Sequence, residues 1–218
     1  MSAADGRVAR LARGTAELGL ALDAPALGDL LAYLDLLAKW NRVYNLTALR
    51  DPEQMLTHHL LDSLAVVAPL RRHTGGAAVR LLDVGSGGGL PGAVIAICCP
   101  EIEVTCVDAV AKKASFIQQV SATLGRGNLQ GRHARVESIE QCFDVIVSRA
   151  FASLGDFVRL SRHARAEGGI WLAMKGKVPS DEIAALPAWV QVFHVEHLIV
   201  PGLDAERCLV WLRPNGST

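Results

Sequence analysis

Apolar positions recur with a helical period through the first third of the chain. One helix is expected over residues 5–18, with apolar side chains on one face and arginines on the other. A second is expected over 27–40, where leucines fall at i, i+3, i+4 and i+7. The chain therefore begins with a helical segment in which no strand is predicted.

A third helix in this segment has a clear start signal. Asp51 is expected to be its N-cap, with Pro52 at N1 and Gln54 at N3, a capping-box pattern. The helix is predicted to end at Pro69 or just beyond. Residues 71–78, which are polar and rich in glycine, are then expected to form a loop.

From residue 79 onward, short apolar runs alternate with helical stretches. The runs predict strands, the third of them weak, at 79–84, 103–108, 128–135, 143–148 and 170–175. Helices are expected at 93–99, 111–124, 153–166 and 180–186. This alternation predicts a parallel sheet with helices on both faces. Two last strands, 191–200 and 207–214, must be antiparallel because their connection is short.

The composition is that of a globular protein. Half of the 218 residues are apolar, and 22 basic side chains balance 22 acidic ones. A disordered chain, a collagen and a disulfide framework are excluded. The length fits one domain with an extension, so we expect a helical extension over 1–75, packed on a catalytic domain over 76–218. No apolar run reaches the ~20 residues of a membrane span, and no secretory signal is visible, which predicts a cytoplasmic protein without membrane contact.

The charge is also balanced within each third of the chain, which disfavours avid, sequence-blind binding of nucleic acid. A local basic face is still compatible with this balance. Its candidates are three groups of neighbouring cations, for which a solvated surface is the alternative: Arg126, Arg132 and Arg135; Arg159, Arg162 and Arg165; Lys175 and Lys177.

Cysteines and histidines show no metal-binding spacing. The five cysteines are odd in number and lack a CxxC pair, so we expect them to be small buried hydrophobic residues. The pair His58–His59 is not part of an HExxH motif. No metal site is predicted.

A glycine-rich loop follows the first predicted strand and carries the clearest chemical signal. Glycines let the backbone turn tightly and approach a ligand without a Cβ in the way. Gly87-x-Gly89-x-x-Gly92 formally matches the dinucleotide pattern GxGxxG. The same loop, read as Asp83-x-Gly85-x-Gly87-x-Gly89, matches the first motif of methyltransferases that use S-adenosyl-L-methionine (AdoMet).

Three observations favour AdoMet over a dinucleotide. Asp83 suits a ligand that carries an ammonium group but would repel a pyrophosphate. Gly87 lies late for a dinucleotide fingerprint. The closing antiparallel pair is typical of the methyltransferase sheet. We therefore expect an α/β fold of the Rossmann-like class I AdoMet-dependent methyltransferase type, with seven strands, mostly parallel, and an antiparallel C-terminal strand. An NAD-dependent oxidoreductase is the alternative.

Two further positions fit such a cofactor. Asp108 ends the second strand, where an acid can accept hydrogen bonds from ribose hydroxyls; its alternative role is the N-cap of helix 111–124. Val136 and Glu137 follow the third strand, where the adenine would lie; the alternative is an ordinary loop.

The fourth strand lacks the motifs of two common methylation chemistries. No [DNS]PP[YFW] turn follows it, as methylation of an exocyclic amine usually needs, and Cys142 precedes the strand rather than following it as a nucleophile for C5 methylation would. This favours an acceptor that already has an available lone pair.

Several segments together resemble a known family, the bacterial 16S ribosomal RNA guanine-N7 methyltransferases RsmG, also called glucose-inhibited division protein B. The matching segments are WNRVYNLTA (40–48), HHLLDSL (58–64), LLDVGSGGGLPG (81–92), VDAVAKK (107–113), RVE (135–137), FDVIVSRAFA (143–152), MKGK (174–177) and LDAERCLV (203–210). The combination of WNxxxNLT with SRAxA is specific to the family. Ala109 departs from it, because a serine is common there.

The resemblance implies methyl transfer from AdoMet to N7 of a guanine in the 530 loop of 16S rRNA, with 16S rRNA or the 30S subunit as partner. We expect a monomer. Family cofactor contacts match Gly85, Leu90, Val136, Glu137 and Arg149, to which Asp83 and Asp108 are added from their chemistry. Substrate candidates, which could instead have structural roles, are Asn45, His59, Asp62, Arg149 and Lys175. Another RNA, a small molecule as acceptor, and a non-catalytic AdoMet-binding RNA chaperone are alternatives.

Overall fold

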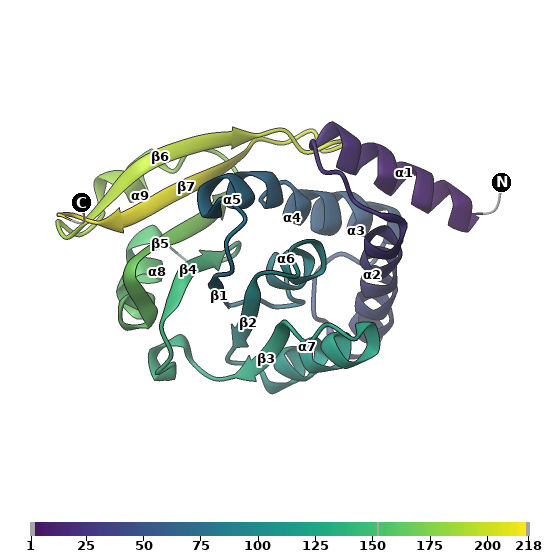
Figure 1. Cartoon of the computed structure of the whole chain (residues 1–218), viewed down its shortest axis with the longest axis horizontal. Helices are drawn as coiled ribbons and strands as arrows, with labels where there is room; N and C mark the ends of the chain where they lie inside the picture. The colour runs from purple at the N-terminus through teal and green to yellow at the C-terminus, as the bar shows by residue number, and fades with distance from the viewer. Residues whose placement is uncertain (1–2, 152, 217–218) are drawn as a thin grey trace.

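The core of the protein is a seven-stranded sheet (Figure 1). A computed structural model describes residues 3–151 and 153–216. The strand order is β3-β2-β1-β4-β5-β7-β6, and β7 is antiparallel to both of its neighbours. The strands are β1 (Arg80–Val84), β2 (Glu103–Asp108), β3 (Leu129–His133), β4 (Phe143–Ser148), β5 (Arg165–Lys175), β6 (Val190–Leu198) and β7 (Arg207–Pro214). The predicted fold class is confirmed.

The central strands are mostly apolar because both faces of the sheet are buried. Successive side chains point to opposite faces, so Leu81 packs into one hydrophobic cluster and Leu82 into the other. Val145 and Ile146 of β4 divide in the same way. A nearly continuous apolar run is typical of a strand that is covered on both sides.

Helices cover both faces. On one face lie α6 (Gly92–Cys98) and α7 (Ala111–Leu124), and on the other α8 (Leu154–Ser161), with α9 (Ser180–Ala184) beside it. The 3-10 turn η2 (Val136–Ser138) follows β3. Figure 1 shows α6 enclosed between the sheet and an arc of N-terminal helices.

The N-terminal helices share the hydrophobic cluster of α6 and α7. They begin with α1 (Ala3–Glu17) and α2 (Ala24–Tyr44), whose N-cap Asp23 accepts a hydrogen bond from the backbone of Ala26. The buried Tyr33 hydroxyl donates to the carbonyl oxygen of Gly88 over 2.7 Å, which ties α2 directly to the glycine-rich loop. In the described ranges no helix is long and apolar enough to cross a membrane.

The third predicted helix differs from the structure. Four short helical pieces replace it: α3 (Pro52–Met55), a π-helix η1 (Leu56–Leu61), α4 (Asp62–Leu64) and α5 (Val67–Thr74). The expected end near Pro69 is wrong, because Pro69 lies in the first turn of α5, where a missing N–H breaks no helical bond. The helix ends instead at Gly75, whose φ of 62° is left-handed. At the start of α3, the Asp51 carboxylate accepts a hydrogen bond from the N–H of Glu53, the N2 residue, rather than from that of Gln54 at N3.

The helix predicted over 153–166 is also too long. It ends at Ser161, a 3-10 turn η3 (Arg162–Ala164) follows, and residues 165–169 already belong to β5. Arg165 pairs with Phe143 across a bulge, and Gly169 packs so closely on β4 that a Cβ would lie 2.9 Å from the Phe143 carbonyl oxygen. The glycines expected to stop a helix therefore build a β-bulge. The strand predicted over 170–175 therefore begins five residues earlier, and the ends of the other predicted elements differ by up to four residues.

Candidate cofactor and acceptor site

Three adjoining hollows lie at the edge of the sheet where the parallel strands end. The glycine-loop hollow, about 510 Å³, is bounded by residues 85–88, Leu46, Thr47 and Arg149. The β2–β3 hollow, about 360 Å³, shares Gly85, Asp108 and Phe151 with it. The Asp62 hollow, about 350 Å³, shares Arg149 with it on the other side. Ligands of open α/β sheets bind at this carboxyl edge.

The glycine-rich loop presents bare backbone to its hollow. Gly85 and Gly87 have φ of 67° and 57°, and a Cβ on either would meet no protein atom within 4 Å. Gly89, with φ of 84°, faces the interior instead, and its Cβ would lie 2.5 Å from Ile117. The first two glycines thus line an open cradle, while the third lets the loop pack on α7.

Asp83 lies beneath this loop and is fully buried. Its Oδ2 accepts a hydrogen bond from the Gly92 N–H over 2.8 Å, and its Oδ1 has no partner in the described part of the chain. Burial raises the pKa of this carboxyl to about 7. Asp83 lines none of the three hollows and supports the start of α6 from below, so its expected contact with a cofactor stays a prediction.

Asp108 connects the loop to the start of α7. Its Oδ2 accepts from the Gly87 N–H over 3.0 Å, its Oδ1 accepts from the Val110 N–H over 2.9 Å, and Lys113 lies 3.6 Å away. The N-cap of α7 is Val110, so Asp108 is not the cap of that helix. Asp108 lines both the glycine-loop and the β2–β3 hollows, and a carboxylate can accept further hydrogen bonds from a ligand.

The remaining predicted cofactor residues line the same hollows. Leu90 borders the glycine-loop hollow. Val136 and Glu137, in the 3-10 turn after β3, border the β2–β3 hollow together with apolar side chains such as Phe151 and Leu160. The structure thus brings Leu90, Val136 and Glu137 to one surface.

Two arginines converge on one buried carboxylate between the hollows. Arg149, just after β4, lies 3.3 Å from Asp62 Oδ2 and donates to the carbonyl oxygen of His58. Arg207, at the start of β7, donates through Nε to Asp62 Oδ1 over 2.7 Å. Asp62 therefore holds together two arginines that are far apart in sequence, and Arg149 faces both the Asp62 hollow and the glycine-loop hollow.

His59 fixes the loop that closes the site on the other side. Its Nε2 lies 2.6 Å from Thr47 Oγ1, and burial, with the Arg149 charge, lowers its pKa to about 4. The imidazole is therefore neutral at physiological pH. Asn41 also holds this loop, by accepting from the Thr47 N–H and donating to the Leu49 carbonyl oxygen.

The other two substrate candidates have different settings. Lys175 borders the Asp62 hollow and is held by both oxygens of Glu182, at 2.9 and 3.0 Å. Asn45 is the C-cap of α2 in the left-handed region, with φ of 51°, and accepts from Arg50. Asn45 lines none of the three hollows, so its expected place at the site is not what the structure shows.

The chain resembles known proteins over most of its length. The family model described as "rRNA small subunit methyltransferase G" matches residues 26–210. The chain belongs to that family. A ribosomal RNA small subunit methyltransferase G of Acidovorax ebreus is 65% identical over 212 residues, covering 94% of each chain. One of Methylibium petroleiphilum is 61% identical over 207 residues, again covering 94% of each.

Solved structures support the fold alone. The 1,6-didemethyltoxoflavin-N1-methyltransferase of Burkholderia thailandensis, solved with S-adenosylhomocysteine, gives a TM-score of 0.57 at 13% identity, covering 89% of this chain and 92% of that one. TrmN of Thermus thermophilus gives 0.56 at 17% identity, covering 70% and 48%.

Four residues that line the hollows were not predicted from the sequence. Thr47, Lys113, Phe151 and Arg207 all line hollows, although none was singled out beforehand. Each lies in or beside a segment of the family resemblance, which is the signal that could have found it.

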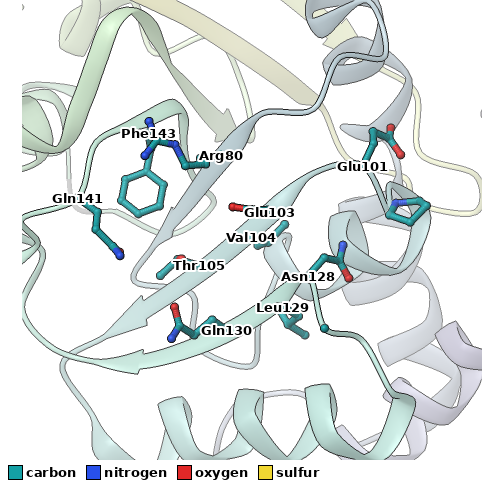
Figure 2. A pocket seen from close by; sticks show the side chains of 12 residues that line it. Arg80, Glu101, Glu103, Val104, Thr105, Asn128, Leu129, Gln130, Gln141 and Phe143 are labelled. Atoms are coloured by element: carbon teal, nitrogen blue, oxygen red, sulfur yellow. The ribbon is translucent and has the colours of Figure 1, made fainter.

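A larger hollow, about 720 Å³, lies at the opposite edge of the sheet (Figure 2). Figure 2 shows Arg80, Gln141 and Phe143 on one side of it and Glu101 and Asn128 on the other. It is formed where strands begin rather than where they end, and its lining includes none of the residues expected to bind a cofactor. The exposed Cys142 lies at this same edge, between Gln141 and Phe143, while the other four cysteines are buried, so the expectation of five buried thiols is wrong for Cys142.

Proposed function

We propose that this protein transfers a methyl group from AdoMet to N7 of a guanine in the 530 loop of 16S rRNA. The observation that carries the proposal is that the family match over residues 26–210 includes all three hollows at the carboxyl edge. Relatives with 94% coverage on both sides bear the name of a small-subunit rRNA methyltransferase.

The residues present fit the cofactor. The apolar walls of the β2–β3 hollow suit an adenine, and Asp108 between the two hollows suits ribose hydroxyls. The open faces of Gly85 and Gly87 leave room for the amino-acid end, whose carboxylate Arg149 can approach. When bound, AdoMet would supply a methyl group on a sulfonium, from which the neutral thioether S-adenosylhomocysteine is a good leaving group.

The Asp62 hollow then lies on the acceptor side. Guanine N7 has an in-plane lone pair and no proton to lose, so the reaction requires no general base. Three of the titratable side chains that line the hollow are already engaged: Asp62 is paired with two arginines, His59 is bonded to Thr47, and His58 Nδ1 lies 3.1 Å from the Gln54 carbonyl oxygen. In-line positioning can supply up to roughly 7–11 kcal/mol of the barrier.

Residues 1–75 are, in this proposal, an extension of the methyltransferase domain 76–218. Their leucines share one hydrophobic cluster with α6, and Tyr33 is bonded to the glycine-rich loop. They also supply Thr47, His59 and Asp62 to the site. We propose a monomer that acts in the cytoplasm on 16S rRNA or the 30S subunit.

Transfer of radiolabelled methyl groups tests this proposal. Purified protein, labelled AdoMet and 30S subunits from a strain lacking the enzyme should give label in 16S rRNA, at a position that N7-specific cleavage and primer extension locate in the 530 loop. A thermal shift with S-adenosylhomocysteine but not with NAD is expected alongside. Label in another RNA or a small molecule, a shift with NAD alone, or cofactor binding without any transfer would contradict it.

A further inference from the structure

A group of cations without acidic partners lies where α2 ends and α7 begins. We call Arg42, Arg50 and Lys112, with the ring of Tyr44, the rim cluster. In the described part of the chain none of the three cations forms an ion pair with a carboxylate. All three are exposed, and Tyr44 is 41% exposed with the Lys112 ammonium 5.1 Å from its ring centre.

The packing of α2 on α7 places this cluster at the carboxyl edge of the sheet. At one end of the helix pair, Arg126, which follows the C-terminus of α7, bonds to Asp29 near the start of α2. At the other end, Lys112 in the first turn of α7 lies over the ring of Tyr44, the last residue of α2. The two helices therefore run antiparallel, and the last turn of α2 emerges beside the first turn of α7. The next residues, Leu46 and Thr47 after α2 and Lys113 in α7, line the glycine-loop hollow.

The groups that sequence proximity suggested as a basic face are mostly engaged elsewhere. Arg126 pairs with Asp29 and Arg159 with Asp156. Arg162 lies over the Trp189 ring at 4.4 Å, and Arg165 donates to the carbonyl oxygens of Ala166 and Gly169. These arginines stabilise local structure, which makes them poorer candidates for contacts with a ligand.

We infer that the rim cluster binds phosphates of the RNA whose guanine enters the Asp62 hollow, an inference that rests on the proposed function. Exposed cations without carboxylate partners have the charge that complements a phosphate backbone. The cluster lies beside the glycine-loop hollow, so RNA held there lies next to the proposed site. The same surface also exposes Val43 and Val110. RNA is favoured over a ribosomal protein because three cations without carboxylate partners lie around an exposed aromatic ring on which a base can stack.

The number of contacts sets the expected size of the effect. Each phosphate neutralised on single-stranded RNA contributes about −0.7 to the slope of log affinity against log salt. Loss of two contacts should thus reduce the slope by about 1.4 and weaken binding by about 10- to 30-fold near 0.1 M salt.

The test compares two double variants. Arg42→Gln with Lys112→Gln removes two rim cations, neither of which lines a hollow. Arg80→Gln with Arg213→Gln removes two exposed cations at the other edge as a control of equal charge. Filter binding to an unmodified 16S transcript and to 30S subunits is measured across salt, with S-adenosylhomocysteine affinity and the melting temperature as independent readouts.

The rim variant should lose affinity and salt slope on the transcript and on the 30S subunit, with a raised KM for RNA, an unchanged kcat and unchanged S-adenosylhomocysteine affinity. The control should match the wild type. Equal losses in both variants, or no loss in either, would overturn the inference. Loss on the 30S subunit alone would assign the surface to a ribosomal protein and overturn it as well. Failure of the proposed function is seen separately, as absence of methyl transfer to 16S rRNA by the wild type.

Discussion

The two edges of the sheet differ in chemistry much more than in size. The hollow at the amino edge measures about 720 Å³, while those at the carboxyl edge measure about 350–510 Å³. The smaller hollows hold the left-handed glycines, the carboxylate between two arginines and the neutral histidine. Volume therefore does not locate the site of this fold. The loops that leave parallel strands do, because they bring residues from distant segments together.

The largest expected effect comes from filling the open cradle. Gly85→Val should abolish measurable binding of S-adenosylhomocysteine in calorimetry while the protein stays folded, because the new side chain enters the hollow and meets no protein atom. Gly125→Val is the matched control, since Gly125 has a similar φ of 62° and open space, but ends α7 at the amino edge. Equal loss in both variants would show that backbone strain, not the cradle, is responsible.

A smaller but still large effect is expected from Arg149→Gln. Methyl transfer should fall by roughly 100- to 1000-fold, as for loss of one charged donor in a catalytic site, while RNA affinity changes by less than about threefold. Arg80→Gln at the amino edge should leave both unchanged. If RNA affinity falls as far as methyl transfer, Arg149 binds RNA rather than acting beside the cofactor.

The buried carboxyl of Asp83, at the carboxyl edge, makes the stability of the protein depend on pH. Burial raises its pKa from 3.8 to about 7, so between these values the folded state binds the proton that the unfolded chain has lost. Stability from this group therefore falls as pH rises, by about 2–3 kcal/mol between pH 5 and 8.

Urea unfolding of the wild type and Asp83→Asn across that range measures this difference, because Asn keeps an oxygen for the Gly92 N–H but cannot ionise. His59, whose lowered pKa destabilises the fold as pH falls, is present in both proteins and cancels from the difference. Parallel curves would mean that Asp83 ionises normally under the loop.

The smallest effect is expected at the amino edge. Mild alkylation of the exposed Cys142 should leave methyl transfer unchanged, because this thiol precedes β4 and lies away from the three hollows. Chelators should likewise have no effect. Mass spectrometry of the alkylated wild type and of the Cys142→Ser variant identifies the alkylated position. Loss of methyl transfer in that variant, with intact cofactor binding, would contradict the mechanism.

The positions of the strands along the chain could be predicted from sequence because their signals are local. Apolar runs such as 79–84 and 143–148 are long enough to identify buried strands, and the glycine pattern 85–89 identified the loop between β1 and α6. Val136 and Glu137 could also be predicted, because they directly follow the strand β3 along the chain. These features depend on neighbours in the chain.

Only the tertiary structure decided the rest. Pro69 is compatible with a helix because it lies in the first turn of α5. Position 169 requires glycine because a Cβ there would lie 2.9 Å from the carbonyl oxygen of Phe143 on another strand. Arg207 meets Asp62 from 145 positions away. Asp83, chosen for its charge, is buried below the loop that it was expected to serve. Burial and pairing between distant residues depend on the packed sheet, and periodicity along one segment carries no record of them.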